Sequence, residues 1–434
     1  MSSNVDVNEH YLDHVVSLAE TSEVQASEDI VSGAGVKLVA KGARIDARVR
    51  ERLLEHKLSK PLESVMRVVE GVGSRRIDRV AAALLERHPL LSAICGEASA
   101  RLHASTLNHL ILTPQVDSLL SVYAAQADGK LEHAVGVALL AAALLEDLPG
   151  GRADPATLML AGLLHDVGEL YIDPQLLKPG QRLTARQWKH IASHPLVGAR
   201  VLRDMPGGGP QVALAVLHHH ERLDGFGYPQ GLKAEALPLH SQALAVAEML
   251  VGVMENGADP AEQAAVAMRL VPGEFDRRLL DRVVTAARGV GLKARASDAN
   301  GGERQMPPVD ELTQRLVTLA TTLTNFRDVR RRIEAEQASY GRELRALLEH
   351  AVVRAERIRV ALASTGLESC SSEESLGRLQ AMNEQARFEV ALVVRELQWR
   401  MGELERQVTI RSEQLAAAEA ARVQDLIAMT KGSA

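Results

Sequence analysis

Histidine is concentrated in one part of this 434-residue chain. Of its 15 histidines, eight lie between positions 133 and 240. They are His133, His165, His190, His194, His218, His219, His220 and His240. Burying an imidazole without a partner costs free energy, and imidazole is also the commonest metal ligand in proteins. Such a density is hard to explain by packing alone, so the clustering indicates a further role for some of these side chains.

The composition around the histidines favours helices. Aromatic residues make up only 3% of the chain, so the core is built mainly from Leu, Val and Ala, of which Ala and Leu are the best helix formers. Residues 124–290 show Ala and Leu at helical spacing, with Gly/Pro breaks at 149–151, 179–180 and 206–210. We therefore predict a mainly α fold, with an all-helical domain over residues 121–295.

The remaining segments differ from this helical domain. Residues 1–26 are polar and are predicted to be a flexible N-terminus. Residues 27–120 are predicted to form a small α+β module, with a short hairpin around the glycines at 33–35 and helices after it. Residues 296–309 are polar and small, and we interpret them as a linker before the C-terminal helices.

A heptad pattern runs through residues 310–430. Leu312, Leu316, Leu319, Leu323 and Phe326 are spaced by four, three, four and three residues, and a second pattern follows a polar break at 365–375. The pattern predicts two long helices in an antiparallel hairpin, or one half of a dimeric coiled coil that would make a homodimer possible. A helical bundle that folds back on the middle domain is the alternative.

Composition excludes several classes of protein. The net charge of −6 argues against a large, sequence-independent grip on nucleic acid. Cys95 and Cys370 lie far apart and are typical of reduced residues in a cytoplasmic protein. The N-terminus has no apolar signal segment, and the longest apolar run, residues 134–145, is too short to span a bilayer. We expect a cytoplasmic protein without membrane insertion.

Two short motifs carry the chemistry. His165-Asp166 follows the apolar residues 158–164, and a carboxylate with two oxygens can bridge two metal ions. The second string runs from His219-His220-Glu221 through Asp224 to a Gly-Phe-Gly-Tyr-Pro turn at 225–229. Nitrogen and oxygen ligands without thiolate suit iron, manganese or zinc. The glycines and the proline fix the loop that presents these polar groups.

Together these motifs resemble the HD-GYP family, a branch of the HD phosphohydrolase superfamily, over about residues 124–290. His133, Lys178-Pro-Gly180 and His194-Pro195 occur in the order expected for that family. The resemblance implies an all-helical domain that holds two divalent metal ions, iron or manganese. It also implies a phosphodiesterase that hydrolyses the cyclic dinucleotide cyclic di-GMP to pGpG or GMP in bacterial signalling.

The resemblance also implies roles for individual residues. The implied metal ligands are His133, His165, Asp166, His194, His219, His220 and Glu248, with Asp166 as the bridging carboxylate. Catalytic roles are assigned to Asp166, Glu169 and Asp224. Substrate binding is assigned to Lys178, Gly225, Gly227, Tyr228 and Pro229. His218 could orient a ligand or simply pack, while His190 and His240 are interpreted as local hydrogen-bonding residues.

The chain departs from the family pattern at several positions. Glu169 replaces a lysine, Glu248 replaces an aspartate, Gln242 replaces an arginine, and an Arg/Tyr-rich segment is missing near 254–260. These departures reduce the number of cationic side chains that could bind a phosphate. Two alternatives to the phosphodiesterase therefore stay open: a degenerate domain that keeps metal but acts as a binding or scaffold module, and a phosphohydrolase for another nucleotide.

Overall fold

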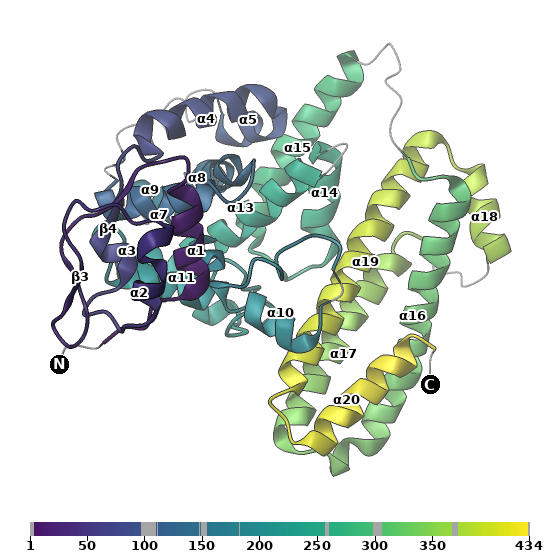
Figure 1. Ribbon diagram of the computed structural model, residues 1–434. Helices are drawn as coiled ribbons and strands as arrows, with labels where there is room; N and C mark the ends of the chain where they lie inside the picture. Colours follow the sequence, from purple (N-terminus) through teal and green to yellow (C-terminus); the bar gives the residue numbers. More distant parts are fainter. Residues whose placement is uncertain are drawn as a thin grey trace. The chain divides into compact units, whose positions relative to one another are not determined.

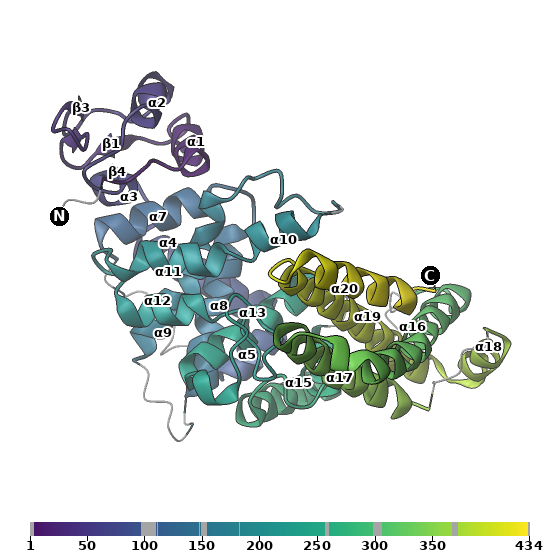
Figure 2. The same ribbon diagram turned by 90° about the horizontal axis from the view of Figure 1, so that it is seen from below.

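The computed structural model describes residues 4–96, 110, 112–146, 148, 154–181, 183–256, 260–297, 306–366 and 372–432. These residues form a mainly α protein, as predicted, with four short strands. The chain divides into two compact units (Figures 1 and 2). Unit 1 comprises Met1–Leu183 and His190–Glu255, and unit 2 comprises Thr184–Lys189 and Asn256–Ala434. Cys370, the break at 149–151, and parts of the predicted linker and of the 365–375 break lie outside the described residues.

Unit 1 begins with a small α+β module. Its elements are α1 (Glu9–Leu18), β1 (Val24–Ala26), β2 (Ile30–Val31), β3 (Lys37–Val39), α2 (Ala47–Leu54), α3 (Leu62–Val65) and β4 (Met66–Val68). Strands β2 and β3 form the hairpin that the glycines at 33–35 predicted. Strand β1 pairs antiparallel with β4, with Val24 opposite Val68. This pairing brings the start and the end of the module together.

The prediction of a flexible N-terminus over residues 1–26 is wrong for most of this stretch. Helix α1 is capped by Asn8, whose side chain accepts a hydrogen bond from the backbone N–H of Tyr11 at 2.9 Å. Tyr11, Leu12 and Val15 are buried on one helix face. The Tyr11 ring stacks on Tyr171 with centroids 4.9 Å apart. The segment is polar overall, and its three apolar residues at helical spacing are too few to predict a helix. They form a buried face only because other parts of the fold pack against them.

The rest of unit 1 is helical. Its elements are α4 (Gly73–Arg87), α5 (Pro89–Cys95), α7 (Pro114–Ala124), α8 (Lys130–Leu145), α9 (Pro155–Leu164), η1 (Val167–Tyr171), α11 (His194–Arg203), α12 (Pro210–Leu217), η2 (Ala234–Ala236) and α13 (Leu239–Asn256). A further helix, α10 (Ala185–Ile191), spans the boundary between the two units. Helix α8 is the centre of the core, because α4, α5, α7 and α9 all pack against it.

Close helix packing in this core depends on one glycine. A Cβ atom at Gly162 on α9 would collide with the Cα atom of Ala138 on α8. The two helices can therefore approach backbone to backbone. This approach sets the distance between the residues that follow α9 and those that α8 presents.

Unit 2 is built from helices alone in its described part. These are α14 (Pro260–Leu270), α15 (Arg277–Ser297), α16 (Val309–Glu336), η3 (Gln337–Ser339), α17 (Arg342–Ala363), α18 (Ser372–Ala381), α19 (Glu384–Ser412) and α20 (Ala417–Thr430). The prediction of a hairpin of two long helices is wrong. The first heptad stretch breaks at 337–341 and the second at 413–416, and α16 packs against α17, α18, α19 and α20. The heptad face is buried inside a folded bundle.

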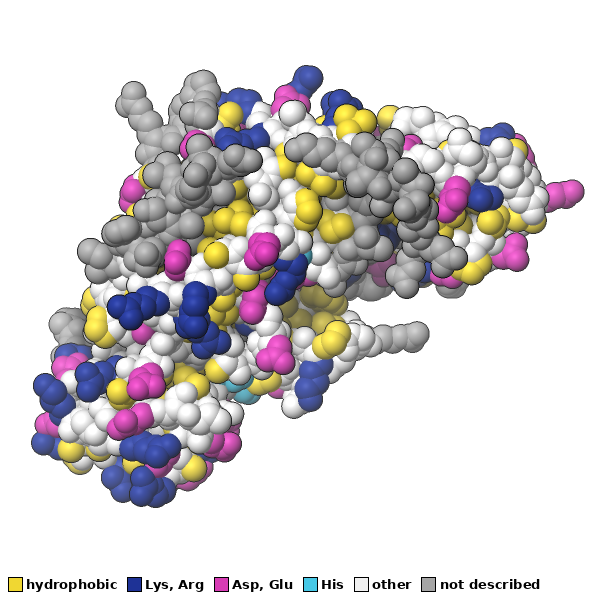
Figure 3. Space-filling model, turned by 90° about the horizontal axis from the view of Figure 1, so that it is seen from above, with side chains coloured by type: hydrophobic (Ala, Val, Ile, Leu, Met, Phe, Trp, Pro, Cys, Tyr) yellow, Lys and Arg dark blue, Asp and Glu magenta, His cyan; other side chains and the backbone are white. Residues whose placement is uncertain are grey.

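None of the described helices is both long and apolar enough to cross a lipid bilayer. Basic and acidic side chains are interspersed with apolar ones over the face drawn in Figure 3. The charge is therefore mixed on this face, as the modest net charge of −6 indicated.

Two arginines that interrupt apolar patterns of unit 2 are buried in a network of carboxylates. Arg354 and Arg400 are 1% and 0% exposed. Arg400 lies 3.0 Å from the carboxylates of both Glu274 and Glu396. Arg354 lies 3.2 Å from Glu274, so this carboxylate joins the two arginines. Removing one partner of a buried ion pair leaves the other charge without compensation, which is strongly destabilising.

We therefore expect Arg400→Leu to lower the free energy of unfolding by about 3–5 kcal/mol, because buried Glu396 would lose the pairing with Arg400 and buried Glu274 would keep only Arg354 of its two arginines. Urea unfolding followed by circular dichroism measures this loss. Arg330→Leu is the matched control, since Arg330 pairs with Glu334 at 2.8 Å on the surface of α16. Equal midpoints for the two variants would contradict the expectation.

Candidate metal centre

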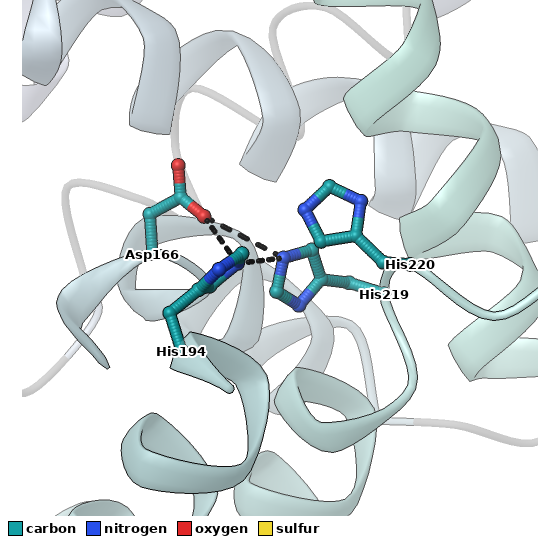
Figure 4. Close-up of side chains that lie close together, drawn as sticks. All are labelled: Asp166, His194, His219 and His220. Atoms are coloured by element: carbon teal, nitrogen blue, oxygen red, sulfur yellow. Dashed lines mark hydrogen bonds and ion pairs between the residues drawn. The ribbon is translucent and has the colours of Figure 1, made fainter. Parts of the chain in front are cut away.

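The predicted ligands come from five separate helices of unit 1, and all of them except Glu248 lie at or near a helix end. His133 lies in the first turn of α8, and His165-Asp166 follow α9 directly. His194 is the first residue of α11, and His219-His220 follow the end of α12. Glu248 lies in α13. Figure 4 shows Asp166, His194, His219 and His220 lying close together.

Backbone carbonyl groups orient three of the imidazoles. The Nδ1 atoms of His165, His194 and His219 lie 2.8, 2.9 and 2.6 Å from the carbonyl oxygens of Gly162, Ile191 and Val216, respectively. Each carbonyl belongs to the residue three positions earlier, so the local helix geometry supplies it. Donation from Nδ1–H leaves the lone pair on Nε2, which is the metal-binding tautomer.

The ligand atoms form two groups. His133, His165 and Glu248 make one, and Asp166, His194, His219 and His220 make the other; within each group the ligand atoms lie within 4.8 Å of one another. Asp166 faces both groups. Its Oδ2 lies 3.3 Å from His165 Nε2, and its Oδ1 lies 3.2 Å from His194 Nε2. This is the arrangement that a carboxylate needs to bridge two cations.

The donor set fits cations better than it fits an apolar core. His194 Nε2 lies 3.1 Å from His219 Nε2, and His133 Nε2 lies 3.2 Å from His165 Nε2. Two imidazole nitrogens that face each other repel through their lone pairs unless a proton or a cation lies between them. The mixed nitrogen and oxygen set suits iron, manganese or zinc.

The electrostatics of the site hold its carboxylates ionised. Burial raises the pKa of Asp166 and of Glu248, but the surrounding imidazoles outweigh burial and hold both values well below the usual range. Burial lowers the pKa of His219 to about 4 and that of His220 well below its ordinary value.

Burial also lowers the pKa of His133, His165 and His194, but the carboxylates outweigh burial and raise all three, that of His133 to about 10. Imidazoles bind metal in the neutral form, so metal binding would displace protons from these three side chains.

Glu248 lies among the predicted ligands although its side chain is one methylene longer than that of the aspartate expected at this position. Its Oε2 atom lies 3.1 Å from the Nε2 atoms of both His133 and His165. The longer side chain therefore reaches the same group of ligands. Glu255 follows Glu248 by about two helical turns along α13. It lies 3.0 Å from the Nδ1 atom of His133 and can orient this imidazole from the other side.

The loop after His220 is held by a carboxylate. Glu221 accepts hydrogen bonds from the backbone N–H groups of Gln230, Gly231 and Leu232 at 2.7, 3.0 and 2.9 Å. The Tyr228 ring stacks on the imidazole of His220, with centroids 4.5 Å apart. The turn that contains Gly225, Gly227, Tyr228 and Pro229 therefore lies against one of the predicted ligands.

Other predicted site residues lie outside the converging groups. The Asp224 carboxylate accepts a hydrogen bond from the backbone N–H of Phe226 at 3.1 Å, as a turn residue does. Lys178 is exposed and donates to Gln175 at 2.7 Å. Gln242 donates to the carbonyl oxygen of Leu237 at 2.7 Å.

Lys130 lies beside the predicted ligands although no sequence motif singled it out. Its ammonium group lies 2.6 Å from Glu169, the acidic residue found where a lysine was expected. Lys130 precedes His133 by three residues, which places both side chains on one face of α8. This spacing could have indicated that Lys130 lies near the predicted ligands. Its pairing with Glu169 could not be predicted, because it depends on how α8 packs against the segment that follows α9.

Part of the chain is similar in sequence to known proteins. Residues 112–279 match the family model of the HD domain. A cyclic di-GMP phosphodiesterase of Pseudomonas aeruginosa is 42% identical over 120 residues, covering 27% of this chain and 28% of the relative. A cyclic di-GMP phosphodiesterase response regulator of Xanthomonas campestris is 37% identical over 122 residues, covering 28% and 30%. A 3'3'-cGAMP-specific phosphodiesterase of Vibrio cholerae is 33% identical over 132 residues, covering 30% of each chain.

Residues 112–279 therefore form an HD domain, with its histidines and aspartate at the ends of packed helices. The Gly-Tyr-Pro turn beside His220 and the named relatives assign this domain to the HD-GYP family. The chain aligns with less than a third of the length of each relative.

Gly168 offers a test of the candidate metal centre in which no predicted ligand is substituted. A Cβ atom at this position would collide with the carbonyl oxygen of His194. We expect Gly168→Ala to move His194 away from Asp166 and so to lower the amount of bound metal. Inductively coupled plasma mass spectrometry measures the metal content. Gly252→Ala on α13 is the control, because nothing lies within 4 Å of its added Cβ. A Gly168→Ala protein with the metal content of the parent would count against this geometry.

Proposed function

We propose that this protein is a metal-dependent phosphodiesterase that hydrolyses cyclic di-GMP to pGpG or GMP in bacterial signalling. The position of Asp166, with one carboxylate oxygen toward each group of ligands, is the observation that supports this function most strongly. Two relatives that share this region are named cyclic di-GMP phosphodiesterases. Hydrolysis of a phosphodiester is a reaction that paired metal ions promote well.

Two divalent ions, iron or manganese, would be held by His133, His165, Asp166, His194, His219, His220 and Glu248. When bound, such ions stabilise charge on phosphate oxygens and make hydroxide available near neutral pH. The chain's own part is orientation. The carbonyl groups of Gly162, Ile191 and Val216 fix the imidazoles, and the ionised Asp166 lies between the two groups of ligands.

A cavity of about 690 Å³ opens beside these ligands and offers room for a substrate. Its walls include His133, Asp166 and Glu248 from the metal centre, and Arg87 and Lys130 from α4 and α8. A cavity in this size range suits a nucleotide-sized ligand. The cations on its walls complement the phosphates of such a ligand.

Another cyclic dinucleotide is the second candidate substrate. The Vibrio cholerae relative is named as specific for 3'3'-cGAMP, which supports a comparison of both compounds. A degenerate domain that keeps metal would retain the same ligand side chains, so turnover separates it from the enzyme; the names of the relatives favour the enzyme. A nucleotide second messenger as substrate would place the enzyme in the cytoplasm. Homodimerisation through the C-terminal helices stays a prediction.

The proposal predicts turnover of cyclic di-GMP by anaerobically purified protein supplied with Fe(II) or Mn(II), measured by chromatography of pGpG and GMP. The His165→Ala/Asp166→Ala variant should lose turnover completely. It removes the carboxylate proposed to bridge the two ions, and it removes His165 from the group that also contains His133 and Glu248. Parallel assays with 3'3'-cGAMP separate the two candidate substrates. A folded, metal-loaded protein that hydrolyses neither compound would overturn the proposal.

A further inference from the structure

Lys130 places an ammonium group on the wall of the cavity beside the metal centre. It is the first residue of α8 and follows Gly129, whose φ of 90° is left-handed and turns the chain into the helix. Its side chain is 30% exposed, and it lines the cavity together with His133, Asp166 and Glu248. Lys130 is thus a cation beside the predicted metal ligands, and it is not itself one of them.

Two neighbours hold this ammonium group. The carboxylate of Glu169 lies 2.6 Å from Nζ and is 18% exposed. The Tyr123 ring lies 5.1 Å from Nζ, at a distance where an aromatic ring attracts a cation. An ammonium group has three N–H donors, and Glu169 needs only one of them. Glu169 itself is not among the residues that line the cavity.

The charges of the cavity make this cation important. Asp128, Glu132, Asp166, Glu248 and Glu255 all contribute to its walls. A phosphate that approaches the ligands therefore meets several carboxylates and needs positive charge nearby. Metal ions would supply part of that charge at the ligands, and Lys130 supplies a fixed charge one helical turn from His133.

We propose that Lys130 binds a non-bridging oxygen of the substrate phosphate at the metal centre, and that Glu169 is a positioning residue that holds the Lys130 ammonium group. The inference rests on the proposed function for the identity of the substrate. It assigns to Glu169 an indirect role in place of the catalytic one expected from the sequence. It also places phosphate recognition at Lys130 instead of at Lys178, which is exposed and pairs with Gln175.

The first experiment measures binding of inorganic phosphate to the Mn(II)-loaded protein by ³¹P line broadening. Lys130→Met should raise the phosphate Kd about tenfold or more, because it removes a charge-assisted hydrogen bond. Lys130→Arg should stay close to the parent. Lys60→Met is the matched control, since Lys60 pairs with Glu28 at the same distance of 2.6 Å on the surface of the N-terminal module.

A double variant separates binding from simple neutralisation. In Lys130→Met, the unpaired Glu169 carboxylate could itself repel phosphate or weaken the fold. Lys130→Met/Glu169→Gln removes both charges, and we expect phosphate binding to stay weak and its dependence on salt to become shallower. Recovery of the parent Kd in the double variant would show that Lys130 only neutralises Glu169 and would overturn the inference. An unchanged Kd in Lys130→Met would do the same.

Kinetics then distinguish this inference from the proposed function. With cyclic di-GMP as substrate, Lys130→Met should raise KM and lower kcat at unchanged metal content, and Glu169→Gln should have a smaller effect. If the parent binds phosphate in a Lys130-dependent way but does not hydrolyse cyclic di-GMP, the proposed function fails and the role of Lys130 stands. If turnover occurs but Lys130→Met matches the parent in KM, kcat and phosphate Kd, only the role of Lys130 fails.

Discussion

The site in unit 1 depends on one carboxylate. Asp166 lies between two groups of imidazoles and offers a different oxygen to each. Its negative charge keeps the facing histidines together in a buried place where they would otherwise repel one another. The histidines in turn hold the pKa of Asp166 low against the effect of burial. Neither set of groups would be stable there alone, so the centre forms as a whole.

Close packing of the backbone makes this convergence possible. Gly162 lets α9 approach Ala138 on α8, and Gly168 lets the segment after Asp166 approach the carbonyl oxygen of His194. Both glycines lie within four residues of the His165-Asp166 pair. The N-terminal module adds support, because the Tyr11 ring stacks on Tyr171 at the end of η1, the same short helix that holds Glu169. The geometry of the site thus depends on contacts far along the chain.

The charge of Glu169 is offset by a residue from another helix. The position where the resemblance led us to expect a lysine holds Glu169, and a lysine from α8 pairs with it. The pair is neutral as a whole, and its cation lies on the cavity wall. Substitutions that look like a loss in a linear motif can therefore be offset by a residue on another helix.

The sequence by itself determined the helical class and the hairpin around the glycines at 33–35, and it singled out the side chains that converge as predicted metal ligands, because composition and short motifs are local properties. Tertiary structure decided the rest. Helix α1 could not be predicted from the sequence, because it depends on the packing that buries Tyr11, Leu12 and Val15. The heptads of residues 310–430 specified an apolar face but not its partner, and the chain breaks them into a bundle. The pairing of Lys130 with Glu169 joins residues 39 positions apart, and only helix packing determines such a contact.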